Sequence, residues 1–364
     1  SDSENEYFSD GLSEELLNVL AQVQVMRVAA RTSSFFYKGK NLNLKDVGEA
    51  LDVQHILEGS VRKAGRTVRI TAQLISVHDG FHLWSKTFDR DITDIFAVQD
   101  EIAAEVAKAM QVTLLDEGVN IVDRSTKNSE AHEIYLRAKE ALYTREKERV
   151  LHAAELFQLA SSMDPEYGPP LVEYATTQLV LYSNNGVGTV LEVGEAAKAA
   201  LDKAASIGYT GSDYYAILGL YHDHMAELDD THIAPARESY LKAIELNPNY
   251  VSAYIWLASL VTEKMHPPQL EYSLQLLETA LKLDPLNRVA NGNYQVWLSA
   301  NGRSEEAEAN VRRLIKLDPE YSTYRLIHVG QQVQAARYLA ATEALMEVPR
   351  EDPRVIGKIG RAHV

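Results

Sequence analysis

The apolar residues nearest the start of the chain recur at helical spacing. Leu12, Leu16, Leu17 and Leu20 fall on one helical face, and the cap-type residue Ser9 stands just ahead of them. This pattern predicts a helix as the first element. Because a domain seldom opens in this way, we expect a strand to precede it.

The period of the pattern then changes along the chain. Residues 25–30, VMRVAA, are strand-like, whereas residues 43–51 place Leu44, Val47 and Leu51 on one face of a helix. Strand and helix patterns that follow one another this closely predict an α+β unit in which helices cover a mixed sheet.

A meander follows. Between residues 55 and 90 apolar and polar residues alternate with a period of two, and the alternation breaks around Gly65 and around Gly80. Glycine accepts the positive φ that tight hairpin turns require. The stretch therefore predicts three antiparallel strands, which an amphipathic helix over residues 94–115 closes.

The rest of the chain repeats one phrase. It reads AAELFQLASSMDPEY, ARESYLKAIELNPNY, SLQLLETALKLDPLN and AEANVRRLIKLDPEY, with Pro165, Pro248, Pro285 and Pro319 in corresponding places. A degenerate copy ends near Tyr209. The last interval between prolines matches a period of about 34 residues, and the one before is slightly longer.

Packing explains the phrase. Small residues such as Ala153 and Ala160 let two antiparallel helices approach closely, and Phe157 fills the space between units. The proline ends a helix because the residue before it is disfavoured in the α conformation. A single helix pair cannot bury its apolar face, so the pairs are expected to stack into an all-α solenoid.

Composition narrows the classes of function. With 46% hydrophobic and 24% charged residues the chain resembles ordinary globular protein, and no apolar run approaches the roughly 18 residues of a membrane span. A formal net charge of −16 disfavours direct nucleic-acid binding. The absence of cysteine excludes disulfides and thiolate zinc sites, and leaves the compartment open between periplasm and cytoplasm.

No pattern of catalytic chemistry emerges. The chain has no GxSxG, HExxH or phosphate-loop sequence, and His78, Asp79 and Gly80 are better explained as a hairpin turn than as a metal-dependent hydrolase motif. His222 and His224 stand two residues apart, so they point to different sides of a helix and favour ordinary histidines over a zinc site. We predict no catalytic, cofactor-binding or metal-binding residue.

The amino-terminal segments ENEYFSDGLSEELLNVL, VAARTSSF, LEGSVRKAGRTVRITAQLI, DGFHLWSKTFDR and DIFAVQDEIA occur in an order that resembles the TolB amino-terminal-like (FlgO-like) domain. The resemblance covers roughly residues 4–114. It implies a domain without catalytic residues, and an additional apolar strand before the first helix. That family occurs in CadC-like transcription regulators and beside class III adenylate or guanylate cyclase domains.

The repeats resemble tetratricopeptide (TPR) repeats over roughly residues 130–350, and in that family the first helix of each pair lines a concave groove. Counting back from each proline places the second, fifth, ninth and twelfth positions of three first helices in this candidate protein-binding groove. These residues are Tyr135, Ala138, Leu142, Arg145, Ile255, Ala258, Thr262, Met265, Val289, Gly292, Val296 and Ser299. Because Arg145 alone could clamp a carboxylate, a peptide-tail clamp is disfavoured. The alternative is that these side chains pack on one another.

These patterns predict a TolB amino-terminal-like α/β domain over residues 1–118 that lacks its first strand, a linker over 119–129, and about five to six helix pairs over 130–353. The array is expected to be irregular over 167–231. Residues 359–364, IGRAHV, resemble a translated sequencing adapter and are interpreted as an artefact.

The favoured function is a non-catalytic protein-interaction or sensory region of a bacterial signalling or transcription-regulatory protein. One alternative is the regulatory part of a class III cyclase whose catalytic domain lies elsewhere; another is an assembly scaffold of the cell envelope. The expected partner is a protein or peptide in the groove, with a homodimer as a further expectation and no cofactor. A membrane anchor in the parent protein would make the region periplasmic, and a soluble parent would make it cytoplasmic.

Overall fold

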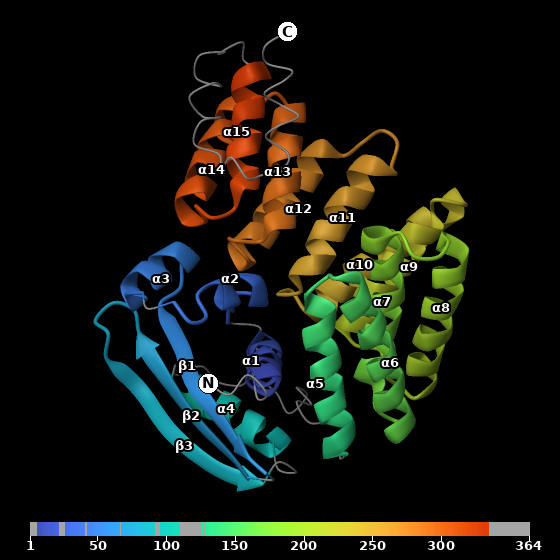
Figure 1. Cartoon of the computed structure of the whole chain (residues 1–364). Coiled ribbons are helices and arrows are strands. Elements are labelled where there is room, and N and C mark those ends of the chain that lie inside the picture. Colours follow the sequence, from blue (N-terminus) through green and yellow to red (C-terminus); the bar gives the residue numbers. More distant parts are fainter. Residues whose placement is uncertain are drawn as a thin grey trace.

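The computed structural model describes residues 6–21, 26–40, 42–65, 67–91, 95–109, 126 and 128–334. They form an α/β unit followed by an array of helices (Figure 1). In this part of the chain, no helix combines the length and the apolar character that crossing a membrane requires. The residues interpreted as an adapter artefact and most of the predicted linker lie outside the described residues.

In the described residues, the α/β unit contains four helices and one sheet. Its elements are α1 (Glu6–Ala21), α2 (Arg31–Phe36), α3 (Leu44–Leu51), β1 (His55–Ala64), β2 (Thr67–Ser76), β3 (His82–Asp91) and α4 (Ile95–Ala109). The strands are antiparallel in the order β1-β2-β3, which confirms the predicted meander. Gly65 and Gly80 have φ angles of +60° and +75° at the two turns, as hairpin geometry requires.

The sheet buries one face against two helices. Val68, Ile70 and Phe88 on that face share a core with Phe8 of α1 and Ile102 of α4. The alternation of buried and exposed residues along β2 is the period-two pattern of its sequence. The same core continues into the first helices of the array, so the two units share one apolar interior.

Residues 26–30, which are the described part of the strand predicted over 25–30, do not form a strand. Their contacts run to the helical array instead, where the Ala30 N–H donates to the Leu283 carbonyl oxygen at 2.9 Å. The Asn249 side-chain amide donates to the carbonyl oxygens of Ala21 and Met26 at 2.6 and 3.4 Å. The hydrogen-bonding partners of this segment are helix ends of the array instead of a neighbouring strand, so the predicted strand is wrong.

The array consists of consecutive helices that pack as antiparallel neighbours. They are α5 (Ser129–Tyr143), α6 (Lys147–Met163), α7 (Gly168–Asn185), α8 (Val190–Ser206), α9 (Ser212–Met225), α10 (Ile233–Leu246), α11 (Val251–Glu263), α12 (Leu270–Leu283), α13 (Arg288–Ala300), α14 (Ser304–Leu317) and α15 (Ser322–Gln334), with a short 3₁₀ turn at Asp230–His232. The fold class is confirmed: an α+β unit precedes an all-α solenoid of paired helices.

The repeated phrase has the packing role that its residues predicted. Ala153, Phe157 and Ala160 of α6 are fully buried, as are Ala236 and Tyr240 of α10. Small residues at the points of closest approach let each helix pair pack tightly. The proline of each phrase comes just after the helix end, as it does for α6 and α14.

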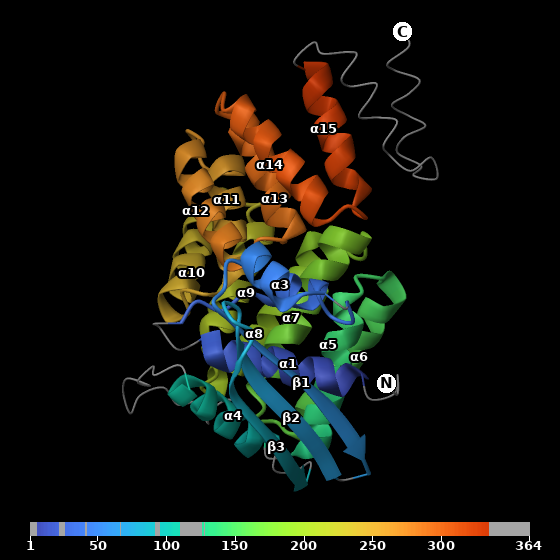
Figure 2. The same ribbon diagram turned by 90° about the vertical axis from the view of Figure 1, so that its left-hand side faces the viewer.

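The array curves around the α/β unit. Helix α5 lies beside α1, and α12 to α15 lie above α2 and α3 in both views (Figures 1 and 2). Contacts between α1 and α5, and between the start of α2 and the end of α12, join the two units. The start of α13 is thereby placed next to the α/β unit.

Candidate functional site: the open face of α13 and the contacts at its start

Helix α13 presents the predicted groove positions to the surface. Val289 and Val296 are 61% and 56% exposed, and Ser299 is exposed. A Cβ placed on Gly292 would have no heavy atom within 4 Å. Val289, Gly292 and Val296 lie on one helical face, which we call the α13 strip.

The predicted positions on α5 are not brought to this surface. Tyr135, Ala138 and Leu142 are buried in the core that α5 shares with α6. Arg145 is exposed, but it lies after the end of α5 with a φ of 58°, and its carbonyl oxygen accepts a hydrogen bond from Asn185 at 3.2 Å. These four residues do not join the α13 strip.

The predicted positions on α11 lie inside as well. Ile255, Ala258 and Thr262 are buried, and the Thr262 hydroxyl donates to the Ala258 carbonyl oxygen at 2.9 Å. Met265 is partly buried beyond the helix end. The unit that α11 begins is longer than 34 residues, so counting back from its proline shifts the register towards the interior.

The α13 strip carries no charge. Arg288 is the charged residue of α13, and its guanidinium is 2.8 Å from the Asp318 carboxylate and lies over the Tyr321 ring. The helix is fixed to its neighbour because the Asn293 amide donates to the Ser259 hydroxyl at 3.1 Å. The strip is therefore an apolar surface on a firmly held helix.

The turn that begins α13 is held by the α/β unit. The Ser33 N–H donates to Oδ1 of Asp284 at 2.9 Å, the Ser33 hydroxyl donates to the same oxygen, and the Leu286 N–H donates to the Ser33 hydroxyl at 2.9 Å. Both Ser33 and Asp284 are buried. We call this contact the Ser33–Asp284 latch; no local sequence pattern distinguishes it, because its partners lie far apart in the chain.

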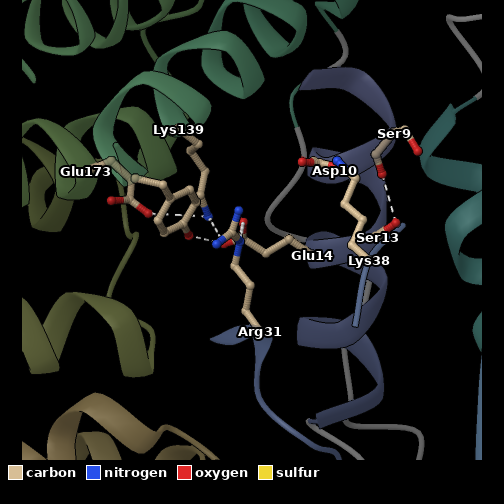
Figure 3. A network of polar contacts seen from close by, with 9 residues as sticks. Ser9, Asp10, Ser13, Glu14, Arg31, Lys38, Lys139 and Glu173 are labelled. Carbon is tan, nitrogen blue, oxygen red and sulfur yellow. Dashed lines mark hydrogen bonds and ion pairs between the residues drawn. The ribbon is translucent and has the colours of Figure 1, made fainter. Parts of the chain in front are cut away.

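A buried ionic cluster joins α1 to α5 (Figure 3). The Lys139 ammonium and the Tyr143 hydroxyl both donate to the Glu14 carboxylate, whose other oxygen accepts from Arg31 at 3.0 Å. Lys139 also lies 3.5 Å from Glu173 of α7. The cluster thus connects the α/β unit with the first two helix pairs of the array.

Burial and charge act in opposite directions within this cluster. Desolvation alone would raise the pKa of Glu14, but the nearby Lys139 and Arg31 outweigh it, and the pKa is lowered. Desolvation opposes charge on Lys139 too, but Glu14 holds the Lys139 pKa well above its usual value. Burial raises the pKa of Glu173. Glu14 and Lys139 therefore form a charged pair that the surrounding residues keep ionised.

Helix α1 carries a second, more exposed group of ionic contacts. Lys38 reaches both Glu6 and Asp10, which precede Glu14 by about two turns and one turn of the same helix (Figure 3). Exposed pairs of this kind contribute little to stability because water and salt screen them.

The histidines of α9 do not form a metal site with each other. Nδ1 of His222 is 2.8 Å from Nδ1 of His232, and Nδ1 of His224 is 2.8 Å from the Leu220 carbonyl oxygen. Among the described residues, no three His, Asp or Glu side chains are grouped as metal ligands. The turn at residues 78–80 is the expected hairpin turn, in which Asp79 accepts from the Phe81 N–H at 3.2 Å.

A cavity of about 1050 Å³ lies within the α/β unit. Aliphatic side chains of α1, α3 and β1 form much of its wall, including Leu16, Val47 and Leu57. It lies beside the outer edge of β1, which pairs with no other strand in the part of the chain that the structure describes. The strand that the family resemblance implies ahead of α1 stays a prediction.

Comparisons with known proteins give partial matches. No family model matches the chain. A protein of Rhizobium meliloti (strain 1021), named "Putative adenylate cyclase 3", is 39% identical over 158 residues, which cover 42% of this chain and 27% of that protein. The chain thus spans about a quarter of the length of this curated relative.

Several solved structures of helical repeats are similar at low sequence identity. A tetratricopeptide repeat protein from Parabacteroides merdae is 15% identical, with 61% of this chain and 79% of that chain covered and a TM-score of 0.40. A chain of the Cut9–Hcn1 complex is 14% identical, with 74% of this chain and 52% of that chain covered and a TM-score of 0.45. YrrB, described as a TPR protein with an unusual peptide-binding site, is 20% identical, with 53% of this chain and 89% of that chain covered and a TM-score of 0.32.

Proposed function

We propose that this chain is a non-catalytic protein-interaction and sensory region of a bacterial signalling or transcription-regulatory protein. In this proposal the helical array binds a protein or peptide partner, and the α/β unit relays or positions the bound state. The α13 strip is the observation that carries the proposal. An exposed, uncharged apolar face on a fixed helix is typical of a surface that a partner covers.

The Ser33–Asp284 latch supports the sensory part of the proposal. It holds the turn from which α13 starts, so a displacement of α13 on partner binding would change the hydrogen bonds of Ser33. The hydrogen bond from the Ala30 N–H to the Leu283 carbonyl oxygen adds to the same contact. A partner on the α13 strip would thereby act on the start of α2.

Two other kinds of full-length protein are candidates for the one to which this chain belongs. The name of the Rhizobium relative supports the regulatory part of an adenylate cyclase, and the class III type with its catalytic domain in a region outside this chain is our proposal. An assembly scaffold of the cell envelope is the third candidate. The coding sequence ahead of Ser1 discriminates among them, since a cyclase domain, a DNA-binding domain with a membrane anchor and a lipoprotein signal differ plainly.

A capture experiment tests the interaction. The whole chain is used as bait in an extract of its own organism, beside a Val289→Asp, Val296→Asp double variant and a control Leu191→Asp, which alters an exposed leucine of α8. We expect wild type and control to retain the same partner and the double variant to lose it. Retention of the same proteins by all three baits would overturn the proposal.

A further inference from the structure

Gly292 differs from five other glycines that lie inside helices and shares with Gly330 of α15 an open space at the Cβ position. A Cβ on Gly219 would lie 2.5 Å from the Tyr240 ring, and one on Gly194 would lie 2.7 Å from Met225. Gly11, Gly48 and Gly168 also face side chains at less than 3 Å. Close packing within the chain therefore explains these five glycines.

Among the described residues, no contact explains Gly292. It lies in the middle of α13, its φ is not positive, and the space in front of it is open. Glycine is among the poorest helix formers, and alanine would fit here without strain. The face of α13 at Gly292 is therefore open to a molecule that approaches from outside.

The flanking residues indicate what that molecule is. Val289 and Val296 stand about one helical turn on either side of Gly292 and are more than half exposed. Between them they form two apolar walls with a gap at Gly292, where the main chain of a partner could come close to the helix. Glycine is used in this way wherever two backbones must approach closely.

Charge excludes two classes of partner segment. The α13 strip has no charged side chain, and Arg288 is already engaged by Asp318. A segment with Asp, Glu, Lys or Arg against the strip would lose hydration without gaining a counter-charge. An uncharged segment loses little, so the strip is complementary to it.

We infer that the α13 strip binds an uncharged, apolar polypeptide segment of a partner protein, whose main chain crosses α13 at Gly292. Apolar side chains of the segment pack against Val289 and Val296 on either side of the crossing. This inference rests on the proposed function and names the chemical class of its partner.

The test uses the whole chain and three dye-labelled synthetic peptides of equal length. One contains only Ala, Leu and Ser; in the second Glu, and in the third Lys, replaces some of the residues. Fluorescence anisotropy gives the affinity of each peptide for wild type, for Gly292→Leu, which fills the gap, and for Ser162→Leu, which adds the same side chain on the exposed end of α6. Analytical ultracentrifugation follows self-association of the same proteins.

We expect the uncharged peptide to bind most tightly, Gly292→Leu to weaken its binding by about tenfold or more, and Ser162→Leu to bind as wild type does. Failure of all three peptides to bind, tighter binding of a charged peptide, or equal affinity of Gly292→Leu and wild type would overturn the inference. A dimer that Gly292→Leu abolishes would assign the strip to a second copy of the chain and overturn it as well.

The capture experiment separates this inference from the proposed function. If the strip variants lose the natural partner although the peptides fail, the proposed function stands and the partner chemistry is wrong. If capture does not depend on the strip, the proposed function fails.

Discussion

Ser33 and Asp284 are hydrogen bonded to each other although 251 residues separate them in the chain. Ser33 lies in the first turn of α2. Asp284 belongs to the Asp-Pro pair that follows α12 and precedes α13. Asp284 thus belongs to a helix-ending phrase of the array and also accepts hydrogen bonds from the α/β unit. This relationship places the start of α13 next to the α/β unit.

Loss of the latch is expected to destabilise the junction. In Ser33→Ala, the Leu286 N–H and one side of the Asp284 carboxylate lose a partner in a buried place, which costs about 1–3 kcal/mol of unfolding free energy. Urea unfolding of the whole chain measures this loss. The exposed Ser162→Ala serves as control, and an equal effect of both substitutions would contradict the assigned role of the latch.

The Glu14–Lys139 pair is expected to show strong coupling. Lys139→Ala leaves the Glu14 carboxylate buried without its main counter-charge, and such a loss costs about 3–5 kcal/mol. In the double variant Glu14→Gln, Lys139→Met no charge of the pair remains, so it should cost clearly less than the sum of Glu14→Gln and Lys139→Met. A double-mutant cycle from urea unfolding checks this, and additive losses would show that the pair is not coupled.

His222 is expected to make the array sensitive to acid. Burial and, to a smaller extent, the neighbouring His232 and Lys198 lower the pKa of His222 to about 4. The folded chain therefore binds a proton at His222 at a lower pH than the unfolded chain does. The stability linked to His222 is present above about pH 6.5 and is lost as the pH falls towards 4.

His222→Gln should therefore lose less stability than wild type between about pH 7 and pH 4.5 in urea unfolding. His152→Gln, which changes an exposed histidine of α6, is the matched control. A wild-type pH profile in the His222→Gln variant would refute this source of acid sensitivity.

Two glycine-to-alanine substitutions are expected to have opposite effects on stability. Gly292→Ala should raise the unfolding free energy by about 0.5–1 kcal/mol, because alanine is the better helix former and nothing obstructs its methyl group. Gly219→Ala should lower it by about 1–3 kcal/mol, because the methyl group would collide with the buried Tyr240 ring. Thermal unfolding of both variants measures the two changes in stability. Changes of the same sign in both variants would contradict the packing described for these helices.

The sequence pattern predicted those elements whose hydrogen bonds join residues close together in the chain. The meander could be predicted because alternation and the turn glycines Gly65 and Gly80 lie within the hairpins themselves. Residues 25–30 have a strand-like composition, but the hydrogen bonds of residues 26–30 go to distant helix ends, so the predicted strand was wrong. A short sequence does not specify which backbone its N–H groups will meet.

The candidate site divides in the same way. Val289 and Val296 could be placed at the surface because the unit of α13 has the regular repeat length. The same count also selects Ala138 of α5 and Ala258 of α11, but both lie inside, in cores that these helices share with their neighbours. The latch could not be predicted, since nothing near Ser33 or near Asp284 indicates that the two meet.

The binding role of the α13 strip is tested most directly by the dissociation constant of the natural partner, once capture has identified it. Its value for the whole wild-type chain is compared with those for the Val289→Asp, Val296→Asp variant and the Leu191→Asp control. We expect about 10- to 100-fold weaker binding by the double variant and unchanged binding by the control. An equal dissociation constant for all three proteins would contradict a role of the α13 strip in partner binding.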